Sequence, residues 1–181
     1  MSEPISLLVL GLGNLLCSDD GLGSAAVARL ESDYDAPPGV RVMDGGTLGL
    51  SLLPYLEDSD QAILVDAIRA EGEPGTFVRL SGEEVAPAVR DRLSPHQVGV
   101  SDLLEGAHWR ERYPRRVVLL GLVPETLELG VARSASVEAG LPELVERILE
   151  EARNLGYEFR PKAPDLARSR GSQLVASLLG L

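Results

Sequence analysis

The amino-acid sequence predicts an α/β fold, with a mostly parallel sheet covered by helices on both faces. Short apolar runs alternate along the chain with stretches of helical periodicity, which is the pattern of repeated strand–helix units. The 181 residues suit a single domain, and a hydrophobic content of 44% is enough for a full core. Aromatic residues make up only 4% of the chain, so aliphatic side chains and alanine must fill that core.

The first part of the chain contains three predicted strands and two predicted helices. Continuous apolar runs, typical of strands buried on both faces, predict strands over residues 6–12 and 61–66, and residues 40–43 are predicted to form a short strand between them. Helical spacing covers residues 20–33 and 48–56, although the second stretch contains Pro54. Asp19 and Asp20 stand at the start of the first helix, where we expect carboxylates to meet free backbone N–H groups.

The second part of the chain adds two predicted strands, two predicted helices and a tail. Alternation over residues 76–80 predicts an edge strand, and residues 116–123 form the most apolar strand. Helices are predicted over residues 97–107 and 135–153. We expect one domain over residues 1–159, followed by a basic tail over residues 160–181. The tail is predicted to be partly disordered, with a short helix near residues 173–179.

Composition excludes several classes of function. The formal net charge of −11 argues against binding to nucleic acid or to an anionic membrane surface. The single cysteine, Cys17, rules out an internal disulfide. Because the N-terminus lacks a basic stretch and a cleavage site, and no apolar run is long enough to cross a bilayer, we expect a cytoplasmic protein. A lysine nucleophile is disfavoured because Lys162 is the only lysine.

Polar residues at the carboxyl ends of three predicted strands form the candidate site. Asp20 follows the first strand, Asp44 ends the second and Asp66 ends the third. Ligands of doubly wound sheets collect at this edge, and carboxylates with the imidazole of His96 suit a divalent ion. Each residue also has a plainer interpretation: Asp20 as a helix-start acid, Asp44 as a turn residue and His96 as a loop or capping residue. Asp66 is the hardest to explain in this way, because a carboxylate at a buried strand end needs a partner.

Two other kinds of site find less support. The turn Gly11-Leu12-Gly13 suits dinucleotide binding, but the third glycine of that motif is replaced by Leu16. Asp19 and Asp20 would also face the pyrophosphate, which is electrostatically unfavourable. A Cys17–His96 nucleophile pair is conceivable, although a lone cysteine in an apolar turn usually serves packing. No GxSxG motif is present.

Five blocks in the same order resemble the hydrogenase maturation proteases. These blocks are GLGNLLCSDDGLG at 11–23, DGGTLG at 44–49, ILVDAI at 63–68, SPHQVG at 94–99 and LLGLVPETLELG at 119–130. The resemblance spans about residues 7–150. It implies a three-layer α/β/α sandwich with a five-stranded sheet, in which one strand, expected at 76–80, runs antiparallel. It does not cover the basic tail.

The resemblance also implies an activity and a site. Members of this family are endopeptidases that remove the C-terminal extension of the hydrogenase large-subunit precursor after nickel insertion. Asp20, Asp66 and His96 match the family's metal ligands, and Asp44 matches a further characteristic position. We therefore expect Asp20, Asp66 and Asp44 to be catalytic, as in an aspartic-type endopeptidase. Nickel is expected to come with the precursor, other divalent ions are expected to fit the same site, and we expect the protein to be a monomer. The alternative is a non-catalytic, nickel-sensing chaperone of the same fold.

Overall fold

A five-stranded sheet lies at the centre of the computed structural model, which describes residues 5–86, 104–107, 109–110 and 112–163. Four strands run parallel: β1 (Ile5–Leu12), β3 (Val40–Gly46), β4 (Ser59–Ala67) and β6 (Arg116–Leu122). The strand order is β3-β1-β4-β6-β5, and β5 (Phe77–Ser81) runs antiparallel to β6. The predicted fold class and the antiparallel edge strand are therefore confirmed.

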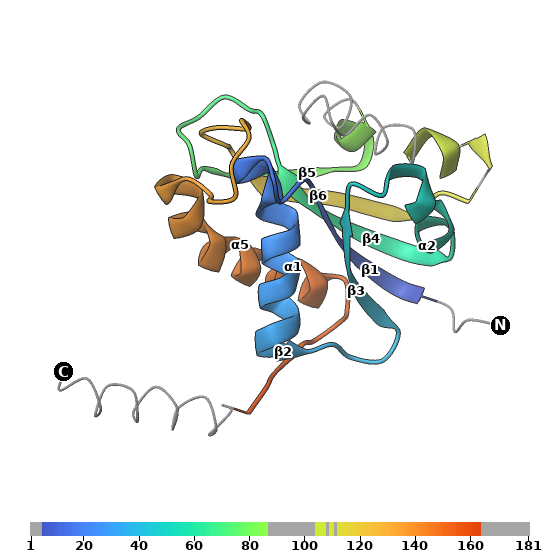
Figure 1. Cartoon of the computed structure of the whole chain (residues 1–181). Coiled ribbons are helices and arrows are strands. Elements are labelled where there is room, and N and C mark those ends of the chain that lie inside the picture. The colour runs from blue at the N-terminus through green and yellow to red at the C-terminus, as the bar shows by residue number, and fades with distance from the viewer. Residues whose placement is uncertain (1–4, 87–103, 108, 111, 164–181) are drawn as a thin grey trace.

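Helices cover both faces of the sheet and complete the three layers (Figure 1). α1 (Leu22–Asp33) and α5 (Ala135–Asn154) contact each other and pack on one face. α2 (Leu53–Glu57) and the helical segment at 104–107 pack on the other. Within the described part of the chain, no helix combines the length and the apolar character that crossing a membrane would require.

Alternating side chains of the central strands feed two separate cores. Leu7 and Val9 of β1 pack in the core under α1 and α5, whereas Leu8 and Leu10 pack in the core under α2. All four side chains are fully buried. Each such burial stabilises the fold by about 1.5–3 kcal/mol. This two-sided burial is why the strands read as continuous apolar runs.

The predicted helices differ from the observed ones mainly at their starts. The stretch predicted as a helix from residue 20 begins with a 3-10 turn, η1 (Ser18–Gly21), and only then continues as α1. The stretch 48–56 is likewise divided into η2 (Gly49–Leu52) and α2, where Pro54 stands in the first turn and costs no backbone hydrogen bond. Of the helix predicted over 97–107, residues 104–107 are helical and 97–103 lie outside the described residues.

The start of the basic tail is fastened to the body of the domain. β7 (Arg160–Pro161) pairs antiparallel with β2 (Tyr34–Asp35), directly after α1. The backbone N–H of Lys162 adds a hydrogen bond of 2.8 Å to the carbonyl of Asp33. The predicted short helix near 173–179 lies outside the described residues.

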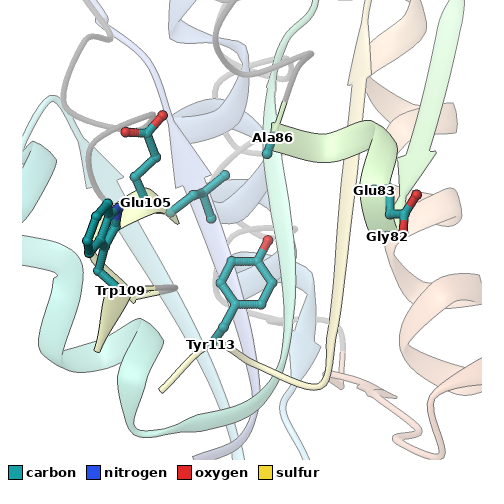
Figure 2. Close-up of a pocket in the computed structure, with 7 residues that line it drawn as sticks. Gly82, Glu83, Ala86, Glu105, Trp109 and Tyr113 are labelled. Atoms are coloured by element: carbon teal, nitrogen blue, oxygen red, sulfur yellow. The ribbon is translucent and has the colours of Figure 1, made fainter. Parts of the chain in front are cut away.

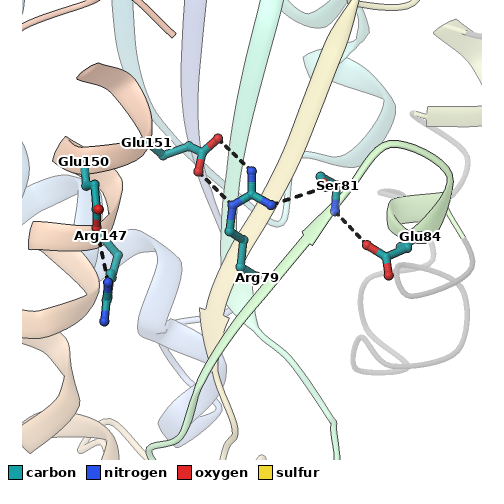
Figure 3. A network of polar contacts seen from close by, with 6 residues as sticks. All are labelled: Arg79, Ser81, Glu84, Arg147, Glu150 and Glu151. Atoms are coloured by element: carbon teal, nitrogen blue, oxygen red, sulfur yellow. Dashed lines mark hydrogen bonds and ion pairs between the residues drawn. The ribbon is translucent and has the colours of Figure 1, made fainter. Parts of the chain in front are cut away.

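An ion pair attaches the edge strand β5 to α5 (Figure 3). The guanidinium of Arg79 donates two parallel hydrogen bonds, of 2.8 and 3.0 Å, to the carboxylate of Glu151. These hydrogen bonds raise the pKa of Arg79. Glu151 is buried, so Arg79 supplies the partner that a charge in this position requires.

Candidate functional site

Asp20 and Asp66 come together around one turn at the carboxyl edge of the sheet. This turn, at Gly13 and Asn14, directly follows β1. A Cβ atom placed on Gly13 would lie 3.5 Å from Oδ1 of Asp66 and only 1.7 Å from the carbonyl oxygen of Asp20. The backbone of Gly13 also has a φ of +116°, which L side chains rarely adopt. A residue without a side chain is therefore required where the turn packs against the backbone of Asp20 and the carboxylate of Asp66.

Asp66 is the second-to-last residue of the central strand β4. It is fully buried, and its Oδ1 accepts a 2.7 Å hydrogen bond from the N–H of Ala67. Its register partner in β6 is Gly121, where a Cβ atom would come within 1.9 Å of the carbonyl oxygen of Asp66. Glycines thus flank this aspartate on the turn after β1 and on the neighbouring strand, and they let the backbone pack tightly around it.

Asp20 reaches the same place from η1. Its side chain is 1% exposed, and Oδ2 accepts a 3.0 Å hydrogen bond from the N–H of Asn14. The side chain of Asn14 in turn accepts from the N–H of Leu16, which fixes the turn. Asn14 was not among the predicted site residues, although its place between a glycine and the acid-bearing turn is a usable signal.

Asp44 lies on the next strand and has a different environment. It is exposed, and its Oδ1 accepts hydrogen bonds from Oγ of Ser24, at 2.7 Å, and from the N–H of Gly46, at 3.0 Å. Gly46 in turn accepts a 3.2 Å hydrogen bond from the N–H of Gly13. Asp44 is thus linked to the Gly13 turn through one residue, at the rim of the edge where Asp20 and Asp66 are buried.

Asp19 serves the framework of the site, a role that the sequence did not reveal. Its buried carboxylate accepts four hydrogen bonds: from the N–H groups of Glu125, Thr126 and Ser134, and from Oγ of Ser134. Asp19 and Asp20 do stand in the first turn of η1, as predicted, but neither η1 nor α1 has a side-chain cap, and the N–H groups that bind Asp19 belong to other segments. In a 3-10 turn successive side chains point about 120° apart, so adjacent acids face different neighbours.

Ser18, just before these acids, stores backbone strain. Its φ is +50°, and it is the one non-glycine residue with a positive φ in the part of the chain that the structure describes. Its N–H donates a 2.7 Å hydrogen bond to the carbonyl of Gly130, while the N–H of Gly130 donates to the carbonyl of Leu16 at 2.9 Å. These two bonds join the turn after β1 to the loop after β6 and hold the strained conformation in place.

The third predicted ligand, His96, lies outside the described residues. Among those that are described, no three His, Cys, Asp or Glu side chains gather as a metal site. The donor set nevertheless fits a divalent ion, because two buried carboxylates share one turn and an imidazole would add a nitrogen ligand. Cys17, which the sequence offered as a candidate nucleophile, is buried, and its N–H donates a 3.0 Å hydrogen bond to the carbonyl of Asn14 in this turn.

The glycines of the Gly11-Leu12-Gly13 turn have packing roles that differ from phosphate binding. A Cβ atom at Gly11 would lie 2.4 Å from the carbonyl oxygen of Gly23, so these two residues let β1 and α1 cross closely. The turn at Gly13 and Asn14 contacts the carboxylate of Asp66 at Gly13 and that of Asp20 at the N–H of Asn14, and these charges would repel a pyrophosphate. The described geometry therefore argues against dinucleotide binding at this turn.

A separate hollow of about 490 Å³ lies on the α2 side of the sheet (Figure 2). Trp109 and Glu105 line it on one side and Gly82 and Glu83 on the other. Burial raises the pKa of Tyr113, which also lines it. Because β5 is antiparallel, Gly82 follows it near the amino ends of the parallel strands, so this hollow is remote from the two acids.

A mostly parallel sheet covered by helices on both faces, with two buried acids at its carboxyl edge, defines the class of protein: an α/β protein with an acidic candidate site. The model of the hydrogenase maturation protease family matches residues 25–151. This chain belongs to that family and is a hydrolase.

Named relatives agree with this assignment. The hydrogenase 2 maturation protease of Escherichia coli K12 is 36% identical over 157 residues, which are 86% of this chain and 96% of that protein. The solved structure of the maturating endopeptidase HybD from E. coli superposes with a TM-score of 0.82 at 36% identity, covering 87% of this chain and 98% of that one. The HybD protease from Thermococcus kodakarensis gives a TM-score of 0.67 at 29% identity, covering 81% and 99%.

Proposed function

We propose that this chain removes the C-terminal extension of a nickel-iron hydrogenase large-subunit precursor after nickel has been inserted. The observation that carries the proposal is the meeting of Asp20 and Asp66 around Gly13, in a chain of the maturation protease family. The named relatives include a hydrogenase 2 maturation protease, which supports a hydrogenase precursor as the substrate.

The proposed chemistry is the hydrolysis of one peptide bond. A water molecule positioned by Asp20 or Asp66 adds to the scissile carbonyl carbon, and the carboxylate takes the water proton. The proton then passes to the leaving amine as the C–N bond breaks, which leaves a new C-terminal carboxylate and a free peptide. Because both acids are buried, they act where water is scarce and electrostatic interactions are strong. Asp44 is the third carboxylate of the proposed centre, at its rim.

In this proposal nickel is part of the substrate, and it signals that the precursor is ready. Asp20, Asp66 and His96 are the proposed protein ligands, and nickel accepts both oxygen and nitrogen donors. A metal shared by the two proteins would hold the scissile bond in place and remove much of the entropic cost of orientation. Other divalent ions with the same preferences are expected to compete for the site. We expect the enzyme to act as a monomer.

The test is to incubate the protein with a purified precursor in nickel-loaded and nickel-free forms. Mass spectrometry should find a shortened product only from the nickel-loaded form. Equal cutting of both forms would refute nickel as the signal. Nickel-dependent binding without any change of mass would support the chaperone alternative instead.

Variants with a matched control then test whether Asp66 and His96 are needed for processing. Asp66→Asn and His96→Ala should abolish processing and leave the far-ultraviolet circular dichroism unchanged. Asp60→Asn is the control for Asp66→Asn, because Asp60 lies on the same strand but is exposed and pairs with Arg115 at 3.4 Å. An active Asp66→Asn variant would exclude Asp66 from the mechanism.

A further inference from the structure

The exposed apolar side chains of this protein are concentrated around the two acids. The large apolar side chains that are exposed in the described part of the chain are Leu15, Leu16, Leu48, Leu50, Trp109, Leu129 and Val131. All of them except Trp109 lie in the segments that follow β1, β3 and β6, at the carboxyl edge of the sheet, with Leu50 in η2. We call these six residues the apolar rim. By contrast, the loop after β4 exposes the charged residues Arg69, Glu71 and Glu73.

The loops that carry the apolar rim are fixed to one another and to the site. Leu16 and Gly130 share a backbone hydrogen bond, which places Leu129 and Val131 beside Leu16. A Cβ atom at Gly21 would lie 3.2 Å from Leu15, so that leucine packs against the residue that follows Asp20. The loop after β3 joins them through the hydrogen bond between Gly13 and Gly46. The same contacts that assemble the acids therefore hold six apolar side chains in contact with water.

We infer that the apolar rim is the surface on which an apolar face of the precursor docks, on both sides of the bond to be cut. This inference rests on the proposed function and adds the surface that recognises the substrate. Clusters of apolar side chains held rigidly in water are typical of protein-binding surfaces. Here the cluster lies on the edge of the sheet at which the two acids are buried, so a protein seated on it would also cover that edge and exclude water. A second copy of this chain in that position would block the site.

The experiment compares variants of the apolar rim with an equally exposed apolar residue elsewhere. The test variant is Leu16→Ser/Leu129→Ser, and Trp109→Ser is the control, because Leu129 and Trp109 are 86% and 85% exposed. Processing of nickel-loaded precursor is followed by mass spectrometry over a range of precursor concentrations. We expect the apparent KM of the double variant to rise at least tenfold, with the saturated rate within twofold of the original protein. Trp109→Ser should change neither quantity.

Several results would overturn the inference. The first is a double variant that cleaves the precursor with an apparent KM less than threefold above that of the original protein. If the double variant unfolds more easily, Leu48→Ser/Leu50→Ser on the loop after β3 repeats the test, and an unchanged KM there has the same meaning. Dimers that the variants dissociate, seen by sedimentation with KM unchanged, would assign the surface to a second copy. Failure of the original protein to cut any precursor would instead refute the proposed function, and the docking surface with it.

Discussion

The replacement of Asp19 by asparagine should destabilise the protein far more than the same change at its neighbour Asp20. The carboxylate of Asp19 accepts one hydrogen bond at Oδ1, from the N–H of Ser134, and three at Oδ2. An asparagine side chain does least harm with its NH₂ group in the place of Oδ1, where it faces the N–H of Ser134. That orientation loses one charge-assisted bond, which costs about 2 kcal/mol. The other three bonds become neutral, and each weakens by about 0.5–1 kcal/mol.

The free energy of unfolding of Asp19→Asn should therefore fall by about 3–5 kcal/mol, a large share of the stability of a domain of this size. Asp20→Asn keeps an amide oxygen for the hydrogen bond from Asn14, so its stability should fall by only about 1 kcal/mol. Its processing of nickel-loaded precursor should fall about 100-fold or more, as expected for the loss of a general base or ligand.

Urea unfolding followed by circular dichroism measures the first quantity, and precursor cleavage below the unfolding transition measures the second. Asp19→Asn should be unstable but active while it is folded, whereas Asp20→Asn should be stable but inactive. A stability loss below 1 kcal/mol for Asp19→Asn would show that the four bonds to Asp19 contribute little. An active Asp20→Asn would show that the acid next to the Gly13 turn is dispensable.

Further substitutions test the turn and the edge of the sheet. Gly13→Ala should abolish processing because its Cβ would overlap a backbone carbonyl. Gly46→Ala has a φ of +46° and so costs about 1–2 kcal/mol of strain, but its Cβ would meet no atom closer than 3.8 Å, and it should remain active. Similar activity of both variants would contradict the close approach at residue 13. Arg79→Ala should lower the free energy of unfolding by about 1–3 kcal/mol, since it leaves the carboxylate of Glu151 buried without its cation (Figure 3). Arg147→Ala, whose ion pairs are exposed, should leave the unfolding midpoint unchanged, and an equal shift in both arginine variants would refute this account.

The parts of the fold that the sequence predicts are those that depend on local pattern. Burial on both faces makes β1, β4 and β6 continuous apolar runs, so their existence and type follow from the sequence alone. Asp20 and Asp66 were proposed as site residues because Asp20 follows the first apolar run and Asp66 ends another, and their catalytic role stays a prediction. The pairing of β7 with β2 was missed, since two-residue strands have no periodicity of their own.

The role of Asp19 could not be predicted, for a different physical reason. Its partners lie 106 to 115 residues away in the chain, in the loop after β6 and at the first turn of α5. Their backbone N–H groups carry no signal in the sequence, and an acid before a helix is equally compatible with an ordinary cap. Only the folded arrangement shows that the donors belong to another loop.

The two adjacent acids thus have different roles: Asp19 holds the framework of the site, and Asp20 belongs to the proposed catalytic centre. Asp19 ties η1 to the loop after β6, and this tie holds Ser18 in its strained conformation and places Leu16 beside Gly130. The side chain of Asp20, expected to point about 120° away, accepts a hydrogen bond from the N–H of Asn14, next to the glycine that the carboxylate of Asp66 approaches. Because one framework positions both the acids and the apolar rim, the Asp19→Asn variant should lose precursor docking and cleavage together when it unfolds, and should keep both while it is folded. Removing Asp20 should affect cleavage while the docking surface stays in place.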